Sequence, residues 1–198
     1  PGVGASATAV VLNVTGIAGA SATHLSLTPD QPGAGGPPTS NLNLPGGAVR
    51  PNLVTAKLDE NKGVWIYNNA GATHVLADLV GWYDDGTAGG DLLTAITPSR
   101  ILDTRPGPDQ TGLDGPFTPA SARPLQVSGR GGVPPVGVSA VVLNVTGVVT
   151  GLTGTHISLT PVNPNGVSPA TSNVNLADKG DVIPNLVVVP LDAHGKVW

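Results

Sequence analysis

Ala9-Val10-Val11-Leu12-Asn13-Val14-Thr15-Gly16 recurs letter for letter at residues 140–147. The residues that follow each copy recur as well, because segment 23–29 returns at 155–161 with one change and segment 51–54 returns unchanged at 184–187. The offset between the copies is 131 to 133 residues, so loops absorb small differences in length. A repeat of this size is a whole folding unit and not a solenoid rung of about 20–50 residues.

Within each copy, apolar and polar residues alternate with a period of two. Val10, Leu12 and Val14 point to one side of the first predicted strand, whereas Asn13 and Thr15 point to the other. The same alternation predicts strands over residues 10–15, 24–28, 41–44, 53–58, 64–68 and 74–83. Clusters of Gly, Pro, Asn and Asp separate these segments, as turns require. No window of about ten or more residues has a helical period, so the sequence predicts an all-β protein.

Two further strands are predicted around residues 93–104 and 123–128, which brings one full unit to eight strands. Eight short antiparallel strands at this spacing predict a β-sandwich or jelly-roll-like unit. A β-trefoil is the alternative because its usual length is close to the repeat period. Its threefold internal signature is weak in this sequence, and we prefer the sandwich.

The predicted organisation is about one and a half copies of the repeat. The first unit covers residues 1–90 with strands one to six, and the second covers 91–198 with strands seven and eight followed by strands one to five of the next copy. Trp198 aligns with Trp65, so the second copy ends inside a unit. We expect that the chain is a piece of a longer array, or that strands from neighbouring copies complete its sheet edges.

The composition indicates a folded, turn-rich protein. It contains 28 Gly and 20 Pro, yet 39% of the residues are hydrophobic and only 11% are charged, which is unlike a disordered chain. A net charge of −4 with no basic run argues against a nucleic-acid partner. No apolar run reaches the roughly 18 residues that a membrane span needs. The lack of cysteine excludes a thiolate metal site, and the lack of both Cys and Met suits an oxidising exterior.

Several segments in one order resemble a known repeat family. They are residues 9–16, 39–44, 51–54, 73–83 and 99–105. Together they resemble the "VLNVT…RLLDTR" repeats of secreted actinobacterial proteins, which occur beside hydrolase domains or in tandem on large surface proteins. The resemblance covers nearly the whole chain and implies a secreted, non-catalytic accessory or surface module. It implies no catalytic or ligand residues, and the second copy departs from it by stopping before its counterpart of residues 77–83.

The most enzyme-like feature is the set of Thr-His pairs at His24, His74 and His156, because a neutral imidazole can act as a base or a ligand. His24 and His156 are one position in two copies, so they need not converge on a pocket. No nucleophile, zinc-protease or phosphate-binding motif accompanies them. A glycoside hydrolase needs two carboxylates about 5–10 Å apart, and the few acids here lie mostly in turns. We therefore predict no enzyme and no cofactor.

Charged residues near the end of the strand predicted at 93–104 admit two interpretations. An Arg–carboxylate fork could bind an acidic ligand. Alternatively the charges are structural, since Asp78 lies inside an apolar strand and needs a partner. We favour a structural group of ion pairs made of Asp78, Arg100, Asp103 and Arg105. The acidic loops at 84–86 and 109–115 lack EF-hand spacing, so we predict no metal site.

The strongest binding candidate is a flat polar strip that occurs in both copies. Alternation places its hydroxyl, amide and imidazole groups opposite the apolar face, where they could bind sugar hydroxyls, and two copies would add avidity. Its residues are His24, Ser26, Asn41, Asn43, His156, Ser158, Asn173 and Asn175, with Trp65 and Trp82 as aromatic platforms. The alternative is that the strip is only the solvated face of a sandwich. The two glycosylation sequons, at 13–15 and 144–146, lie inside strands and are interpreted as accidental.

Two functions follow from these observations. The leading hypothesis is a secreted, cell-surface accessory module that binds a polysaccharide or cell-wall glycan, that is, a carbohydrate-binding or adhesion module. The alternative is a structural repeat of an extracellular array or fibre, whose partners are other copies of the same repeat.

Overall fold

The computed structural model describes residues 3–87, 89–151 and 154–198. Residues 1, 2, 88, 152 and 153 fall within the two predicted units but lie outside the described residues. The described part of the chain contains strands and no helix, which confirms the all-β prediction. No helix that could cross a membrane is found among these residues. The strands are β1 (Ala7–Ala18), β2 (Thr23–Thr28), β3 (Leu42–Leu44), β4 (Val49–Lys57), β5 (Trp65–Asn68), β6 (Thr73–Asp84), β7 (Leu125–Gln126), β8 (Ala140–Val148), β9 (Thr155–Ile157), β10 (Val174–Leu176), β11 (Val182–Pro190) and β12 (Lys196–Val197).

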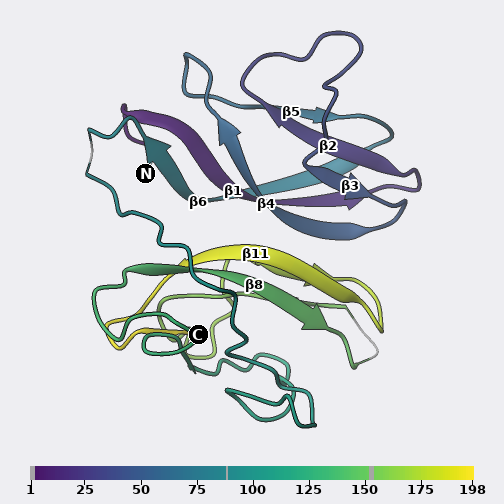
Figure 1. The fold of residues 1–198 in the computed structure, drawn as a ribbon. Coiled ribbons are helices and arrows are strands. Elements are labelled where there is room, and N and C mark those ends of the chain that lie inside the picture. The colour runs from purple at the N-terminus through teal and green to yellow at the C-terminus, as the bar shows by residue number, and fades with distance from the viewer. Residues whose placement is uncertain (1–2, 88, 152–153) are drawn as a thin grey trace. The chain divides into compact units, whose positions relative to one another are not determined.

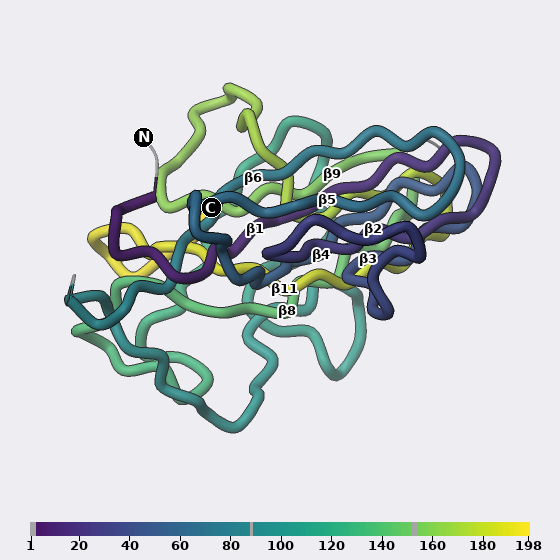
Figure 2. Tube along the Cα trace, turned by 90° about the horizontal axis from the view of Figure 1, so that it is seen from above, coloured from purple at the N-terminus to yellow at the C-terminus, as the bar shows by residue number. Residues whose placement is uncertain are grey.

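The first repeat is a β-sandwich of two three-stranded antiparallel sheets. One sheet has the order β4-β1-β6 and the other β3-β2-β5 (Figure 1). The strands extend along a common direction when seen from above (Figure 2). Val10, Leu12 and Val14 of β1 share one buried core with Leu25 of β2 and Leu42 of β3. The apolar face predicted from the alternation is therefore the face that joins the two sheets, and the sandwich, not the trefoil, is the fold.

Close packing between the sheets explains the glycine that ends the repeated octapeptide. A Cβ atom at Gly16 would lie 2.5 Å from Leu44 Cδ1 and 3.2 Å from methyl carbons of Leu25 and Leu42. A Cβ atom at Gly147 would likewise lie 2.8 Å from Leu176 Cδ1. Since neither glycine has a positive φ, the missing side chain, and not backbone freedom, is what the site requires.

The second repeat reproduces two strand pairs of the first repeat and one position of a third. β8 pairs with β11 as β1 pairs with β4. β9 pairs with β10 so that His156 lies opposite Asn175, as His24 lies opposite Asn43. Trp198 and Thr160 exchange two backbone hydrogen bonds of 2.9 Å, at the positions where β5 pairs with β2 in the first repeat. The alignment of the copies by sequence is therefore also their structural alignment.

The strand predicted around residues 93–104 is not formed. Residues 89–102 contain no strand, and Asp103 makes only an isolated bridge with Thr111. Leu92 and Leu93 are 94% and 77% exposed, so the apolar side chains at the start of this segment face no core. Alternation alone cannot form a strand where no neighbour supplies a hydrogen-bonded ladder. The strand predicted at 123–128 is present as β7 but spans two residues.

Contacts divide the chain into two compact units. Unit 1 contains residues 1–90, 144–157 and 173–187. Unit 2 contains residues 91–143, 158–172 and 188–198. The range 91–198 thus contributes to both units, and unit 1 brings segments of the second repeat together with the first repeat.

Candidate functional site

Two residues of the predicted polar strip bind the chain's own backbone. Ser26 is fully buried, and its Oγ donates a hydrogen bond to the Thr39 carbonyl at 2.5 Å. The Asn41 Oδ1 accepts a hydrogen bond of 2.7 Å from the Leu27 amide. Asn52 of β4 adds a third bond, from its Nδ2 to the Asn41 carbonyl at 2.6 Å. These residues fix the loop between β2 and β3 and are not available as ligand groups.

A smaller polar face remains on the sheet β3-β2-β5. His24 lies opposite Asn43 on β3, and its ring is tilted at 44° to the ring of Tyr67, with 6.3 Å between centroids. Trp65 follows on β5 opposite Thr28 and is 43% exposed. Imidazole, amide and aromatic groups therefore gather on one face. Trp82 does not join them, because it lies on β6 of the other sheet.

The second repeat makes similar hydrogen bonds between the residues of its polar strip and its own backbone. The Ser158 Oγ donates to the Thr171 carbonyl at 2.7 Å, as Ser26 donates to Thr39. The backbone amide of Asn173 donates to the Ile157 carbonyl at 2.8 Å, as that of Asn41 donates to the Leu25 carbonyl. The two copies diverge at Asn175, since its Nδ2 donates to the Thr15 Oγ1 of the first repeat at 3.2 Å. In this copy the predicted sugar strip is therefore partly a contact surface for protein.

Unit 1 contains an asparagine cluster, made of Asn13 and Thr15 on β1, Asn175 on β10 and Asn185 on β11. Asn185 is its centre, because its Nδ2 donates to the Asn13 Oδ1 at 2.8 Å. The same Nδ2 donates to the Asn173 carbonyl at 2.6 Å. The Asn185 Oδ1 accepts the Leu53 amide of β4 at 3.0 Å. One side chain of the second repeat thus binds a side chain and a backbone group of the first.

Three of the four members of the asparagine cluster are buried, so their hydrogen bonds matter for stability. Asn13 is 1% exposed, Thr15 5% and Asn185 4%. An amide taken out of water without a partner costs about 1–3 kcal/mol, so buried amides fix the geometry of their partners. Thr15 and Asn13 lie on the face of β1 opposite the apolar core, so β1 is buried on both faces.

An ion pair accompanies the asparagine cluster. Arg50 Nη1 lies 3.6 Å from Asp181 Oδ2. Backbone hydrogen bonds from Asp178 and Ala177, assisted by the nearby Arg50 charge, hold the pKa of Asp181 below its usual range. The carboxylate is therefore ionised at neutral pH and adds an attraction between the repeats that salt weakens.

The sequence contains a signal for this cluster. Asn13 stands between apolar residues of β1, in the sequon that we interpret as accidental, and Asn185 belongs to the repeated segment 184–187. A polar residue between apolar ones in a strand needs a partner if both faces are covered. Period-two alternation gives the face on which Asn13 lies but not the partner that covers it.

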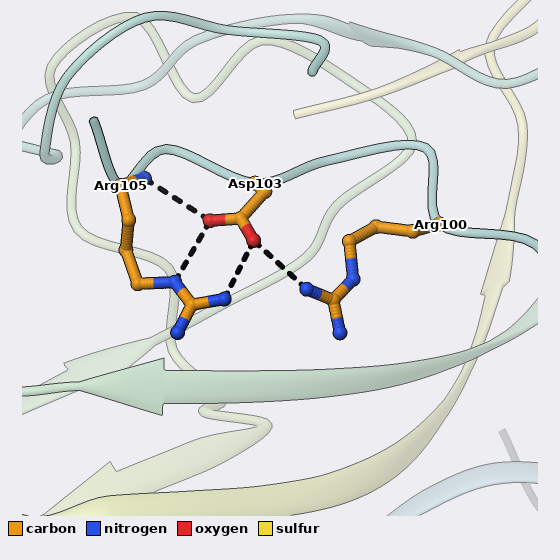
Figure 3. Close-up of polar contacts among 3 residues, drawn as sticks. All are labelled: Arg100, Asp103 and Arg105. Carbon is orange, nitrogen blue, oxygen red and sulfur yellow. Dashed lines mark hydrogen bonds and ion pairs between the residues drawn. The ribbon is translucent and has the colours of Figure 1, made fainter. Parts of the chain in front are cut away.

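The charged residues around Asp103 form a closed group in unit 2. Arg105 donates two hydrogen bonds to the Asp103 carboxylate, from Nε to Oδ1 at 3.0 Å and from Nη2 to Oδ2 at 2.7 Å (Figure 3). Arg100 donates a third, from Nη1 to Asp103 Oδ2 at 2.9 Å. Side-chain and backbone hydrogen bonds from Arg105 hold the pKa of Asp103 well below its usual range. Both carboxylate oxygens are thus occupied by the chain's own cations. A cavity of about 220 Å³ lined by residues 103 and 105–110 lies beside this group. It is smaller than the roughly 300–1,000 Å³ of small-molecule sites.

Asp78 takes no part in the charged group. It makes no ion pair in the described part of the chain, and burial raises its pKa. The histidines are spread over separate elements, with His24 on β2, His74 on β6 and His156 on β9. Within residues 3–87, 89–151 and 154–198, no three His, Asp or Glu side chains gather as metal ligands would.

The candidate sites of the molecule are thus a polar contact between repeats, a small polar face with aromatic residues, and an internal ion-pair group. No family model, no curated protein and no solved structure matches this chain.

Proposed function

We propose that this chain is an exported, non-catalytic structural module, in which copies of the repeat pack on one another to build an extracellular array. The observation that carries the proposal is the buried Asn185 side chain, which binds Asn13 and the Leu53 amide across the repeats. Polar groups with defined partners specify one packing geometry, whereas an apolar patch would tolerate several. The resemblance to tandem repeats of secreted surface proteins supports the same role.

Hydrogen exchange at the Leu53 amide tests this proposal directly. Leu53 lies on β4, an edge strand whose outward amides would exchange rapidly if water covered them. The acceptor of its amide is Asn185, which is 132 residues away in the other repeat. Asn185→Ala should therefore accelerate exchange at Leu53 by at least tenfold.

The matched control is Asn52→Ala, the same substitution at the equivalent position of the first repeat. The Asn52 side chain donates to Asn41 and accepts no bond from Leu53, so exchange at Leu53 should remain slow. If exchange at Leu53 is equally fast in the wild type and both variants, the repeats do not pack as proposed.

A second candidate function is glycan binding at the face of His24, Asn43, Tyr67 and Trp65. The observation that favours it is the gathering of an amide, an imidazole and an exposed indole on one sheet. Binding to a polysaccharide panel should then vanish in a double variant with His24→Ala and Asn43→Ala, and should persist in His74→Ala. Absence of binding to every wall and plant polysaccharide would remove this candidate.

A further inference from the structure

The contact between the repeats is one-sided. The second repeat contributes Asn175 and Asn185, and the first repeat receives them at Thr15 and Asn13. Each repeat nevertheless contains both kinds of residue. Residues 144 and 146 of β8 repeat the receiving pair, and residues 43 and 52 repeat the inserted pair.

The receiving surface of the second repeat is uncovered. We call Asn144, Thr146 and Val148 the β8 face. All three are exposed, whereas their counterparts Asn13 and Thr15 are buried. Within the described residues the side chains of Asn144 and Thr146 make no hydrogen bond. The same polar pair is therefore saturated on β1 and open to solvent on β8.

The inserting residues of the first repeat are already oriented for such a contact. Asn52 Nδ2 donates to the Asn41 carbonyl at 2.6 Å, as Asn185 Nδ2 donates to the Asn173 carbonyl at 2.6 Å. The Asn185 Oδ1 accepts the Leu53 amide, whereas the Asn52 Oδ1 has no donor among the described residues. Little rearrangement of Asn52 is needed for it to bind as Asn185 does.

Within unit 1 the contact is not reciprocal, because Asn185 binds Asn13 whereas the Asn52 side chain donates to Asn41 and makes no described bond to Asn144. A contact of twofold symmetry would join both pairs. The contact is instead heterologous, and a heterologous contact leaves one unmatched surface of each kind, through which further copies can add.

We propose that a second copy of this chain docks on the β8 face through Asn52 and Asn43 of its first repeat, and so repeats between molecules the contact made within each one. The proposal rests on the proposed function, since it uses the same contact. Asn52 binds Asn144 and the Leu186 amide, and Asn43 binds Thr146, as Asn185 and Asn175 bind the first repeat.

Sedimentation velocity of the full chain, from micromolar to millimolar concentration, tests the proposal. The wild type should associate as concentration rises. Thr146→Asp places an unpaired charge in the contact and should weaken association by at least tenfold. Thr94→Asp, the same change at another exposed threonine in a segment without secondary structure, should leave association unchanged. Both sites are exposed, so neither variant should unfold.

Cross-linking gives the second readout, and the chain has no native cysteine to confuse it. A mixture of Asn43→Cys and Thr146→Cys chains, treated with a short bismaleimide, should yield the mixed covalent dimer. A mixture of Asn43→Cys and Thr94→Cys chains should not.

A chain that stays monomeric at every concentration would overturn the proposal, as would association that Thr146→Asp leaves intact. Loss of polysaccharide binding in Thr146→Asp without any self-association would overturn it too, because the β8 face would then serve a glycan. Hydrogen exchange at Leu53 reports the contact within one chain, so its outcome does not depend on whether any of these results is obtained. Failure of the docking contact is therefore distinguishable from failure of the proposed function.

Discussion

Replacing Asn185 by alanine should destabilise the protein far more than the same change at Asn52, although the repeats are alike at these positions. Asn185→Ala removes three hydrogen bonds, to Asn13, Asn173 and Leu53, from a side chain that is 4% exposed. At a net contribution of about 1 kcal/mol for each bond, the loss is about 3 kcal/mol. Asn52→Ala removes one described bond, so its loss is about 1 kcal/mol.

Urea unfolding measures the difference between these two variants. The three tryptophans provide a fluorescence signal, and far-ultraviolet circular dichroism follows the strands. With a urea m-value of about 2 kcal/mol/M, a difference of about 2 kcal/mol separates the two midpoints by about 1 M. The measurements belong at low protein concentration, where contacts between molecules do not contribute. Equal losses at Asn185 and Asn52 would refute the reasoning, because each asparagine would then serve only its own repeat.

Three further results are expected. Gly16→Ala should lower the free energy of unfolding by about 1–3 kcal/mol, because the added methyl group would meet Leu44. Gly81→Ala on β6, where nothing lies within 4 Å of the added methyl group, should be neutral or stabilising. Equal changes in melting temperature for the two variants would contradict the packing argument. Asp103 has a folded pKa below its unfolded value of about 3.9, so it stabilises the fold above about pH 4, and this stabilisation is lost as pH falls through the folded pKa. Arg105→Gln should therefore move acid unfolding, followed by circular dichroism, to higher pH, and an unchanged acid midpoint would speak against the ion-pair group. Adding EDTA should leave the melting temperature unchanged, since a fall would reveal a bound metal ion.

The sequence was sufficient to predict the strands of the first repeat, because each is encoded locally. The alternation of Val10, Leu12 and Val14 with polar residues gives both the strand and its core face. The pairing of Trp198 with Thr160 also follows from the repeat, since their counterparts pair in β5 and β2. The prediction of a strand at residues 93–104 was wrong because no neighbouring strand pairs with this segment, although its residues alternate.

The contact between the repeats could not be predicted in the same way. Asn13 and Asn185 are separated by 172 residues, and no local pattern records which face covers which. The sequence places Ser26 and Asn41 in the predicted polar strip because polar residues on a strand face are usually solvated. Here the Thr39 carbonyl of the loop between β2 and β3 accepts a hydrogen bond from Ser26, and the Leu27 amide of β2 donates one to Asn41.

A double-mutant cycle of Asn13→Ala and Asn185→Ala tests the central claim most directly. The two side chains share a buried hydrogen bond of 2.8 Å, so removing either should remove part of what the other contributes. The packing of one repeat on the other predicts a coupling energy of about 1 kcal/mol or more in the free energy of unfolding. Additivity within about 0.3–0.5 kcal/mol, which is the behaviour of distant sites, would contradict it.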